Sequence, residues 1–189
     1  NFINMIPKHA KKVFKGVLFD VYHWDQKILD GRTKKFEKLK SQDNVTVIAT
    51  VGNKIIAMKQ KQPAHSGWYL DLPGGRLDIP NESAADGAKR ELLEETGFSS
   101  TKMKLLKSFK RQGHINYTTS LFIARNSVKN AEQSLDGGEI IKPILITYTY
   151  FKDLLLNDKF YIDPSIKLYL IRARLDKKFD AELKKQIFG

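Results

Sequence analysis

The sequence predicts an α/β fold, a sandwich in which helices flank a mixed β-sheet, with a β-hairpin extension at the N-terminus. Strand-like runs precede one strongly patterned helix, and further strand-like runs and a second helical region follow it. With 189 residues and 41% hydrophobic content, the chain can bury one core and carry a modest extension. We therefore expect one main domain with an appendage.

The N-terminal region has the pattern of a hairpin. Val13–Tyr22 is rich in β-branched and aromatic residues, and a polar stretch from 25 to 33 containing Asp30-Gly31 follows it. The apolar pattern resumes at Phe36. These features predict two strands joined by a turn.

One boundary between parts of the chain is visible. The polar run Lys40–Asp43 separates the hairpin from the rest of the chain, and we find no internal repeat or low-complexity segment. We expect residues 1–43 to form an N-terminal β extension and residues 44–189 to form the main domain.

The middle of the chain predicts a sheet that leads into a loop. Val45–Val51 and Lys54–Met58 are strand-like runs joined by Gly52-Asn53, a two-residue turn signal. Trp68–Leu72 continues the sheet, and the proline and paired glycines of Leu72–Gly75 then break regular structure.

A helix is predicted next, from Ser83 to Glu95. A capping pair of Ser83 and Asp86 opens it, and Gly97 closes it. Because both ends carry their own signals, this is the best-defined element of the sequence.

Strands and helices alternate again after Gly97. Three strand-like runs are Met103–Phe109, Tyr117–Ala124 and Ile140–Tyr148, with a polar loop from 125 to 138 before the last of them. Asp163-Pro164 predicts the start of a helix, since proline suits the first helical position. We expect an apolar stripe on that helix, made of Ile166, Leu168, Leu170, Ile171 and Leu175. A lysine-rich amphipathic tail ends the chain.

Composition restricts the chemistry. The absence of cysteine excludes disulfides, thiolate nucleophiles and zinc sites built on sulfur, so a metal would be held by carboxylate, carbonyl, water or histidine. The sequence contains no run of about 18 apolar residues, the length that a bilayer-spanning helix needs. Residues 1–15 also lack the apolar core of a signal peptide followed by a small-residue cleavage site. We expect a soluble, cytoplasmic protein without a membrane partner.

The net charge of +12 raises the question of nucleic-acid binding. The basic residues are mostly lysines scattered along the chain in short runs such as Lys34-Lys35, so we do not expect a nucleic-acid partner. A positive surface would still attract a substrate that carries phosphates.

Three glutamates crowd one face of the predicted helix. At about 100° per residue, Glu91, Glu94 and Glu95 fall within an arc of roughly 100°. The opposite side carries the apolar residues Ala85, Ala88 and Leu92. Like charges at these spacings destabilise a helix, more so near its negative end, and so favour a compensating cation. An isolated charge run of this kind usually only solvates a helix face.

The surroundings of the glutamates favour the cation. Gly74-Gly75 lies directly before the helix and Glu82 lies at its entrance, so bare backbone and acidic side chains converge. Carboxylate, carbonyl and water oxygens are the ligands that Mg²⁺ prefers, and phosphates of the substrate usually complete its coordination. We therefore expect a Mg²⁺ site, with Mn²⁺ as an alternative.

Gly75, Glu82 and Arg90–Phe98 resemble the Nudix box, G-x5-E-x7-R-E-U-x-E-E-x-G-U, in which U is a bulky aliphatic or aromatic residue. The helical half matches at every defined position. One departure is that six residues, Arg76–Asn81, separate Gly75 from Glu82 where the pattern has five. An insertion here alters the shape of the loop but not the spacing on the helix. Glu82 would be an outer ligand or a stabiliser of this loop.

The resemblance implies a role for each matching residue. Glu91 and Glu95 would be the principal metal ligands, Glu94 would coordinate directly or through water, and the carbonyl of Gly74 would add a ligand. Arg90 would orient the acidic residues through charge-assisted hydrogen bonds. The metal would neutralise the diphosphate group of a nucleotide substrate and polarise the water molecule that attacks it.

The general base is expected from a late acidic loop, as in relatives that act on ADP-ribose. Glu139 is most similar to the acidic motif of that subgroup, and Asp136 is the second candidate. Glu132 shares the loop, and because polar loops are usually acidic, all three could be ordinary solvated residues. His65 and His114, in other loops, are expected to be solvated and without a role.

Other segments are similar, loosely but over most of the chain, to the ADP-ribose pyrophosphatase branch of the superfamily. They are Tyr22–Asp25, Phe36-Glu37, Val45–Thr50, Gln60–Pro63, Trp68–Gly75 and Phe160–Ile166. The resemblance implies hydrolysis of ADP-ribose or a related nucleotide sugar to a nucleoside monophosphate and a sugar phosphate. It also implies a homodimer in which the N-terminal strands pack across the interface.

Substrate contacts are suggested by residue type alone. Trp24 is our candidate for stacking on the base, with Tyr22 and Trp68 as alternatives, although single aromatic residues more often pack in cores or interfaces. Lys61 and Arg76 are candidates for phosphate contacts because they lie near the box in sequence, or they are surface charges.

Two other functions stay open. The same site could act on a dinucleoside polyphosphate, a damaged nucleoside triphosphate or a capped RNA end. Alternatively, the chain could be a non-hydrolytic Nudix domain that senses a nucleotide. The intact Glu91, Glu94 and Glu95, and the lack of an appended DNA-binding helix pair, argue against the sensor.

Overall fold

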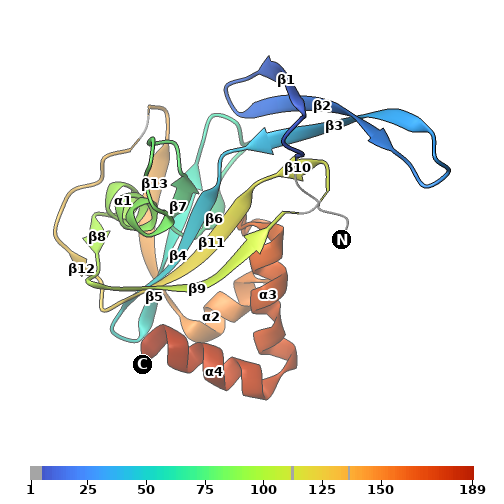
Figure 1. The fold of residues 1–189 in the computed structure, drawn as a ribbon. Coiled ribbons are helices and arrows are strands. Elements are labelled where there is room, and N and C mark those ends of the chain that lie inside the picture. Colours follow the sequence, from blue (N-terminus) through green and yellow to red (C-terminus); the bar gives the residue numbers. More distant parts are fainter. Residues whose placement is uncertain (1–5, 112, 136) are drawn as a thin grey trace.

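A seven-stranded mixed sheet forms the centre of the molecule (Figure 1). The computed structural model describes residues 6–111, 113–135 and 137–189. The main strand order is β13 (Ile140–Thr147), β5 (Lys54–Lys61), β4 (Asn44–Val51), β11 (Thr118–Arg125) and β9 (Lys102–Lys110). Two short strands extend it, β6 (Tyr69–Asp71) beside β5 and β7 (Gly74–Arg76) beside β4. β4 and β11 pair in parallel, whereas the other neighbouring strands that the structure describes in this sheet pair antiparallel, so the sheet is mixed.

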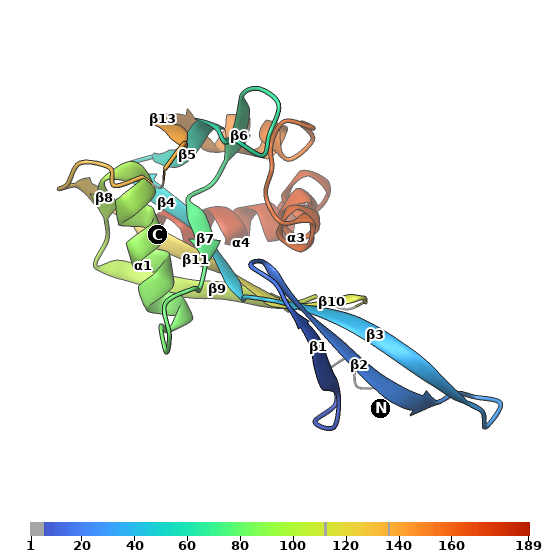
Figure 2. The ribbon, with the colours of Figure 1, turned by 90° about the horizontal axis from the view of Figure 1, so that it is seen from above.

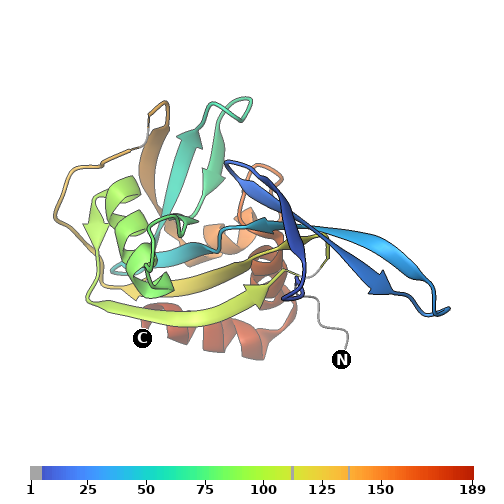
Figure 3. The same ribbon diagram turned by 45° about the horizontal axis from the view of Figure 1, so that its top comes forward.

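Helices cover both faces of this sheet, as Figure 3 shows. α1 (Ala84–Thr96) packs on one face. The other face is covered by α2 (Tyr148–Leu154), α3 (Pro164–Leu175) and α4 (Lys177–Phe188). The predicted α/β sandwich is confirmed. In the part of the chain that the structure describes, no helix combines the length and apolar character needed to cross a membrane.

The central strands are apolar on both sides because both sides are covered. In β5, Ile55 and Ala57 face α2–α4, whereas Ile56 between them faces α1, and all three are fully buried. Val51 and Lys54 face each other across the Gly52-Asn53 turn, so the predicted hairpin is confirmed.

The N-terminal extension differs from the prediction. It is a three-stranded antiparallel arm of β1 (Lys11–Lys15), β2 (Phe19–Lys27) and β3 (Thr33–Ser41), and β10 (Ile115–Asn116) joins β3 in parallel. Val13–Tyr22 is therefore not one strand. The chain turns after Gly16, whose N–H donates to the carbonyl of Phe19 over 3.0 Å. The apolar residues in this turn hid the break, and Figure 2 shows the arm projecting from the main sheet.

The last predicted strand ends one residue early, and a helix follows it. Tyr148 begins α2, where the hydroxyl of Thr147 accepts a hydrogen bond from the N–H of Tyr150 over 3.1 Å. The sequence pattern missed α2 because the apolar run continues without interruption from strand into helix.

The predicted helix start at Asp163-Pro164 is confirmed, but the apolar stripe is partly wrong. The side chain of Asp163 accepts from the N–H of Ser165 over 2.8 Å. Ile166 and Leu170 are fully buried, whereas Leu168 is 72% and Leu175 is 84% exposed. Residues two apart on a helix point in different directions, so Leu168 cannot share the buried face of its neighbours.

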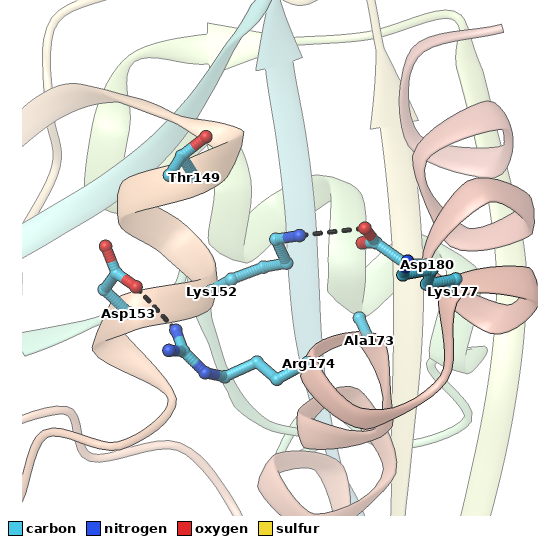
Figure 4. Close-up of a pocket in the computed structure, with 7 residues that line it drawn as sticks. All are labelled: Thr149, Lys152, Asp153, Ala173, Arg174, Lys177 and Asp180. Carbon is cyan, nitrogen blue, oxygen red and sulfur yellow. Dashed lines mark hydrogen bonds and ion pairs between the residues drawn. The ribbon is translucent and has the colours of Figure 1, made fainter.

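Polar contacts attach α4, the predicted amphipathic tail, to α2. Lys152 on α2 pairs with Asp180 on α4, as the dashed line in Figure 4 marks. The two atoms lie 2.8 Å apart, and both residues line a pocket of about 360 Å³. The hydroxyl of Tyr148 donates to the other oxygen of Asp180 over 2.7 Å. A second ion pair, between Arg174 and Asp153, joins α3 to α2. Asp180 therefore connects the C-terminal helix to the rest of the helical layer.

Candidate active site

α1 has the predicted position and the predicted ends. The hydroxyl of Ser83 accepts from the N–H of Asp86 over 3.1 Å at the start. Gly97 ends the helix with φ 74°, a left-handed conformation that glycine adopts without strain, and its N–H donates to Leu93. Ala88 and Leu92 are fully buried against the sheet. The helix is thereby fixed in rotation, which determines where its glutamates point.

Arg90 is the centre of an ion-pair network on this helix. Its Nε and Nη2 donate to the two carboxylate oxygens of Glu82 over 2.8 and 3.0 Å. Its Nη1 donates to Glu91 over 2.8 Å and to Glu94 over 3.0 Å. Its Nη2 also reaches the carbonyl of Arg76 over 3.1 Å. One guanidinium thus links three carboxylates to the loop before the helix.

Glu95 contacts the main chain of Gly74 rather than Arg90. We call the segment Leu72–Gly75 the glycine loop, although its two glycines begin strand β7. The carboxylate of Glu95 accepts a hydrogen bond from the N–H of Gly74 over 2.8 Å. The side-chain amide of Gln133 donates to the carbonyl of Glu95 and, over 3.2 Å, to that of Ile141. Sequence reasoning did not find Gln133, which carries no motif.

Gly75 allows the loop to approach Glu91. A Cβ atom at this position would lie about 2.5 Å from the carboxyl group of Glu91. Any side chain at Gly75 would therefore push that carboxyl group away from the loop. The glycine in the motif thus has a steric role that the structure makes explicit.

The site holds more buried negative charge than its cations compensate. Burial raises the pKa of Glu91 to about 7, although Arg90 opposes this. Burial also raises the pKa of Glu95 well above its ordinary value, against the effect of the Gly74 N–H. Two carboxyl groups separated by one helical turn are therefore unfavourable in their charged forms, which a divalent cation would relieve.

The donor set fits a hard cation in chemistry but is arranged as ion pairs. Glu91, Glu94 and Glu95 supply carboxylate oxygens beside the main chain of Gly74. Among residues 6–111, 113–135 and 137–189, no three acidic or histidine side chains already converge as metal ligands. Arg90 instead bonds Oε1 of Glu91 and Oε2 of Glu94, so a metal would use the second oxygen of each carboxylate.

Two further carboxylates, Glu139 and Asp71, lie near Glu95. Glu139 directly precedes β13, and Asp71 ends β6; both raise the pKa of Glu95 through their charges. Asp71 accepts from the N–H of Leu72 over 2.7 Å and from Gln60 over 3.3 Å, and burial raises its pKa well above the usual range. Asp71 was missed from sequence, although strand alternation in Trp68–Leu72 could have indicated it.

Glu132, on the same loop as Glu139, is a surface residue. Glu132 is 92% exposed at its side chain and pairs with Lys129 at 3.7 Å. Asp136 lies outside the residues that the structure describes. Of the predicted base candidates in the part of the chain that the structure describes, Glu139 is thus the one that lies near Glu95.

The predicted substrate contacts are scattered. Trp24 lies on the arm, with its ring 5.9 Å from that of Phe36 on the neighbouring strand. Arg76 follows the glycine loop, exposed, with its carbonyl bound to Arg90. Lys61 ends β5 opposite Ile140. Because Gln60 points toward Asp71, alternation directs Lys61 to the sheet face opposite α1.

The alternative aromatic residues also have local partners. The ring of Trp68 has the ammonium groups of Lys59 and Lys142 at 5.4 Å each. Tyr22 has Lys12 at 5.6 Å. Both arrangements are cation–π contacts of the surface.

Comparison with known proteins agrees with this geometry. Residues 40–161 match the family model described as NUDIX domain. An ADP-ribose pyrophosphatase of Bacillus subtilis (strain 168) is 29% identical over 140 residues, 72% of this chain and 75% of that protein. A methanol dehydrogenase activator of Bacillus methanolicus is 30% identical over 141 residues, 73% of this chain and 76% of that protein.

A solved structure shows the same fold. The crystal structure of an ADP compounds hydrolase superposes with a TM-score of 0.72 and 21% identity, covering 90% of this chain and 94% of that chain. The family model spans the central sheet from β4 to β13, with α1 and its glutamates. This chain is a Nudix hydrolase with ADP-ribose pyrophosphatase-like relatives.

Proposed function

We propose that this protein hydrolyses the diphosphate bridge of ADP-ribose or of a related nucleoside diphosphate sugar in a Mg²⁺-dependent reaction. The products are a nucleoside monophosphate and a sugar phosphate. The observation that carries the proposal is the pair of buried carboxyl groups, Glu91 and Glu95, whose pKa values burial raises next to the glycine loop. The similarity to an ADP-ribose pyrophosphatase favours this substrate class.

Glu91, Glu95, Glu94 and the carbonyl of Gly74 are the proposed metal ligands. When bound there, Mg²⁺, or Mn²⁺ in its place, would supply positive charge for the diphosphate and for the attacking water. The donors are all oxygen atoms, which suits either ion. In the proposed ligand set Glu91 and Glu94 bind the metal through their second oxygens, while Arg90 keeps its bonds to the first oxygens, to Glu82 and to the carbonyl of Arg76.

Glu139 is the proposed general base. Glu139 directly precedes β13, and its charge raises the pKa of Glu95, a proposed metal ligand, which supports this role. The carboxylate of Glu139 would take a proton from the attacking water as a new oxygen–phosphorus bond forms. The bond from that phosphorus to the bridging oxygen breaks, and the bridging oxygen leaves with the other phosphate. Asp136 is the alternative base.

The test is a panel of diphosphate compounds with product separation. Purified protein with Mg²⁺ is incubated with ADP-ribose, ADP-glucose, a diadenosine polyphosphate, a damaged nucleoside triphosphate and capped RNA. We expect ADP-ribose to give AMP and ribose 5-phosphate. The Glu95→Gln variant should lose turnover, whereas Glu132→Gln, an exposed acid, should keep it. Intact ADP-ribose after incubation would refute the proposal, and cleavage of another compound alone would reassign the substrate.

We further propose that residues 1–43 form a dimerisation arm of a cytoplasmic homodimer, with residues 44–189 as the hydrolase domain. The arm exposes apolar side chains, including Val13, Phe14 and Val17, and the last is 97% exposed. Exposed apolar side chains gathered on one element favour burial against a partner. The proposal would also let Trp24 on the arm and Arg76 next to Arg90 contact a substrate at a site formed by two chains, whereas Lys61 lies on the sheet face opposite α1.

Light scattering after size-exclusion chromatography tests the dimer. The native protein should elute with twice the mass of one chain. A Phe14→Asp change, which places a charge on the exposed strand β1, should yield monomers with an unchanged circular dichroism spectrum. A monomeric native protein would rule this assembly out.

A further inference from the structure

Three aromatic side chains from separate segments pack together beside the acidic site. They are Tyr69 in β6, His65 in the loop before it, and Tyr161 in the segment after α2. The ring centroids lie 4.7 Å apart for His65 and Tyr69, 5.0 Å for Tyr69 and Tyr161, and 5.4 Å for His65 and Tyr161. We call these three residues the aromatic corner. His65 is exposed as expected, but its ring also packs against the rings of Tyr69 and Tyr161.

Backbone hydrogen bonds hold the aromatic corner in position. The N–H of Leu70 donates to the carbonyl of Lys159 over 2.7 Å, and the N–H of Tyr161 donates to the carbonyl of Leu70 over 2.8 Å. The N–H of His65 donates to the carbonyl of Gln62 over 3.0 Å. Main-chain bonds therefore join β6 to the segment of Tyr161, and a turn within its own loop positions His65, so the rings form a surface before any ligand arrives.

The aromatic corner adjoins the proposed reacting centre. Tyr69 and Asp71 alternate on β6 and so share the sheet face that carries α1. Burial, followed by the charges of Asp71 and Glu139, raises the pKa of Tyr69 to about 12. The loop before β6 also lies against the loop before β13, since a Cβ at Gly138 would be 3.1 Å from Pro63. A group attached to a diphosphate at α1 would meet these rings.

The chemistry of the aromatic corner selects the kind of group it can hold. Tyr69 is buried, but Tyr161 is 51% exposed and His65 is open to solvent, so aromatic surface is available. A planar heterocycle can stack on such a surface. A sugar would need hydrogen-bond partners for each hydroxyl, and the three rings offer few. The nearby carboxylates Asp71 and Glu139 would repel a further phosphate.

We infer that His65, Tyr69 and Tyr161 form the binding surface for the nucleobase of the substrate. The inference rests on the proposed hydrolysis of a nucleoside diphosphate compound and assigns one half of that compound to a place on the protein. Tyr161 would supply the exposed stacking face, His65 the second face, and Tyr69 the buried support beneath them. All three residues belong to one chain, so this surface could bind the nucleobase without a second copy of the protein.

Calorimetric titration with the two expected products tests the assignment without turnover. AMP carries the base and ribose 5-phosphate does not, so both are titrated into the full-length protein with Mg²⁺. Stacking on an aromatic side chain contributes roughly 1–3 kcal/mol, so Tyr161→Ala should weaken AMP binding about tenfold. Tyr161→Phe should bind AMP like the native protein. Tyr150→Ala, a matched control at a 46% exposed tyrosine of α2, should change nothing.

The outcomes separate the inference from the hydrolase proposal. Equal AMP affinity in Tyr161→Ala and in the exposed-loop variant His65→Ala, an equal loss for ribose 5-phosphate, or no AMP binding to the native protein would overturn the inference. ADP-ribose turnover of the native protein is measured in parallel. If AMP binding depends on Tyr161 while ADP-ribose stays intact, the base site stands and the proposed reaction falls.

Discussion

Arg90 holds Glu82 by two parallel hydrogen bonds, Nε to Oε1 over 2.8 Å and Nη2 to Oε2 over 3.0 Å. Glu82 ends the loop that is one residue longer than the Nudix pattern, and its side chain is 7% exposed. A paired guanidinium and carboxylate fix both distance and orientation. The pair therefore attaches the longer loop to the same helical turn that carries Glu91, and the insertion leaves the helix undisturbed.

Glu82→Gln should destabilise the protein by about 1–3 kcal/mol, since it removes the negative charge and one of the two acceptor oxygens that Arg90 binds there. It should also lower kcat, because Arg90 is then less firmly oriented toward Glu91 and Glu94. Chemical denaturation and steady-state kinetics measure the two effects. Glu132→Gln is the matched control on an exposed acid. If both variants behave alike, Glu82 does not anchor the loop.

Mg²⁺ should stabilise the native protein against heat. A ligand that binds only the folded state adds about 2.7 kcal/mol at a hundred times its Kd, which raises Tm by roughly 5–10 °C for a chain of this size. Glu95→Gln removes a proposed ligand and should abolish most of the rise. Differential scanning fluorimetry with and without Mg²⁺, at constant ionic strength, measures this. A rise of equal size in Glu95→Gln would place the ion elsewhere.

Glu139→Gln should lower kcat by about 10²–10⁴-fold with little change in KM or in the Mg²⁺-dependent rise of Tm, since general-base catalysis contributes about that much. Asp136→Asn, measured beside it, should keep most of its activity. If Asp136→Asn lowers kcat more than Glu139→Gln does, Asp136 is the general base.

The sequence determined those parts of the fold whose signals are local. The capping pair at Ser83, the left-handed position at Gly97 and the turn at Gly52-Asn53 each depend on neighbouring residues, and all three are confirmed. The β1–β2 turn was missed because Val17 and Leu18 are apolar although they are exposed. Leu168 was misassigned because apolar character does not reveal which side of a helix faces the core.

The candidate site shows the same division. The motif predicts which glutamates gather on α1, because they share one helix. Alternation in β6 could have indicated Asp71, but its position near Glu95 depends on strand pairing, and Tyr161 comes to the site only through a connection after α2. Long-range contacts of this kind depend on the whole topology, and no short spacing in the chain records them.

Asp180 should stabilise the attachment of α4 in a pH-dependent way. Burial would raise the pKa of Asp180, but the hydrogen bonds from Lys152 and Tyr148 outweigh it and lower the pKa below the usual value of 3.8. A carboxyl group whose pKa is lower in the folded state stabilises the fold above its unfolded pKa, and this stabilisation is lost as the pH falls through the folded pKa. Asp180→Asn should therefore cost about 1–3 kcal/mol at pH 7, and the difference from the native protein should persist to about pH 4 and shrink below it.

Urea unfolding at pH 7, 5, 4 and 3 measures this difference. Asp153→Asn is the control, because Asp153 pairs with Arg174 at a more exposed position of the same layer and surface ion pairs contribute little. A difference for Asp180→Asn that is unchanged at pH 3 would mean that the hydrogen bonds of Asp180 do not depend on its charge. The protonated carboxyl group would then hold α4 as well as the carboxylate does, and the ion pair with Lys152 would contribute nothing to holding the C-terminal helix in place.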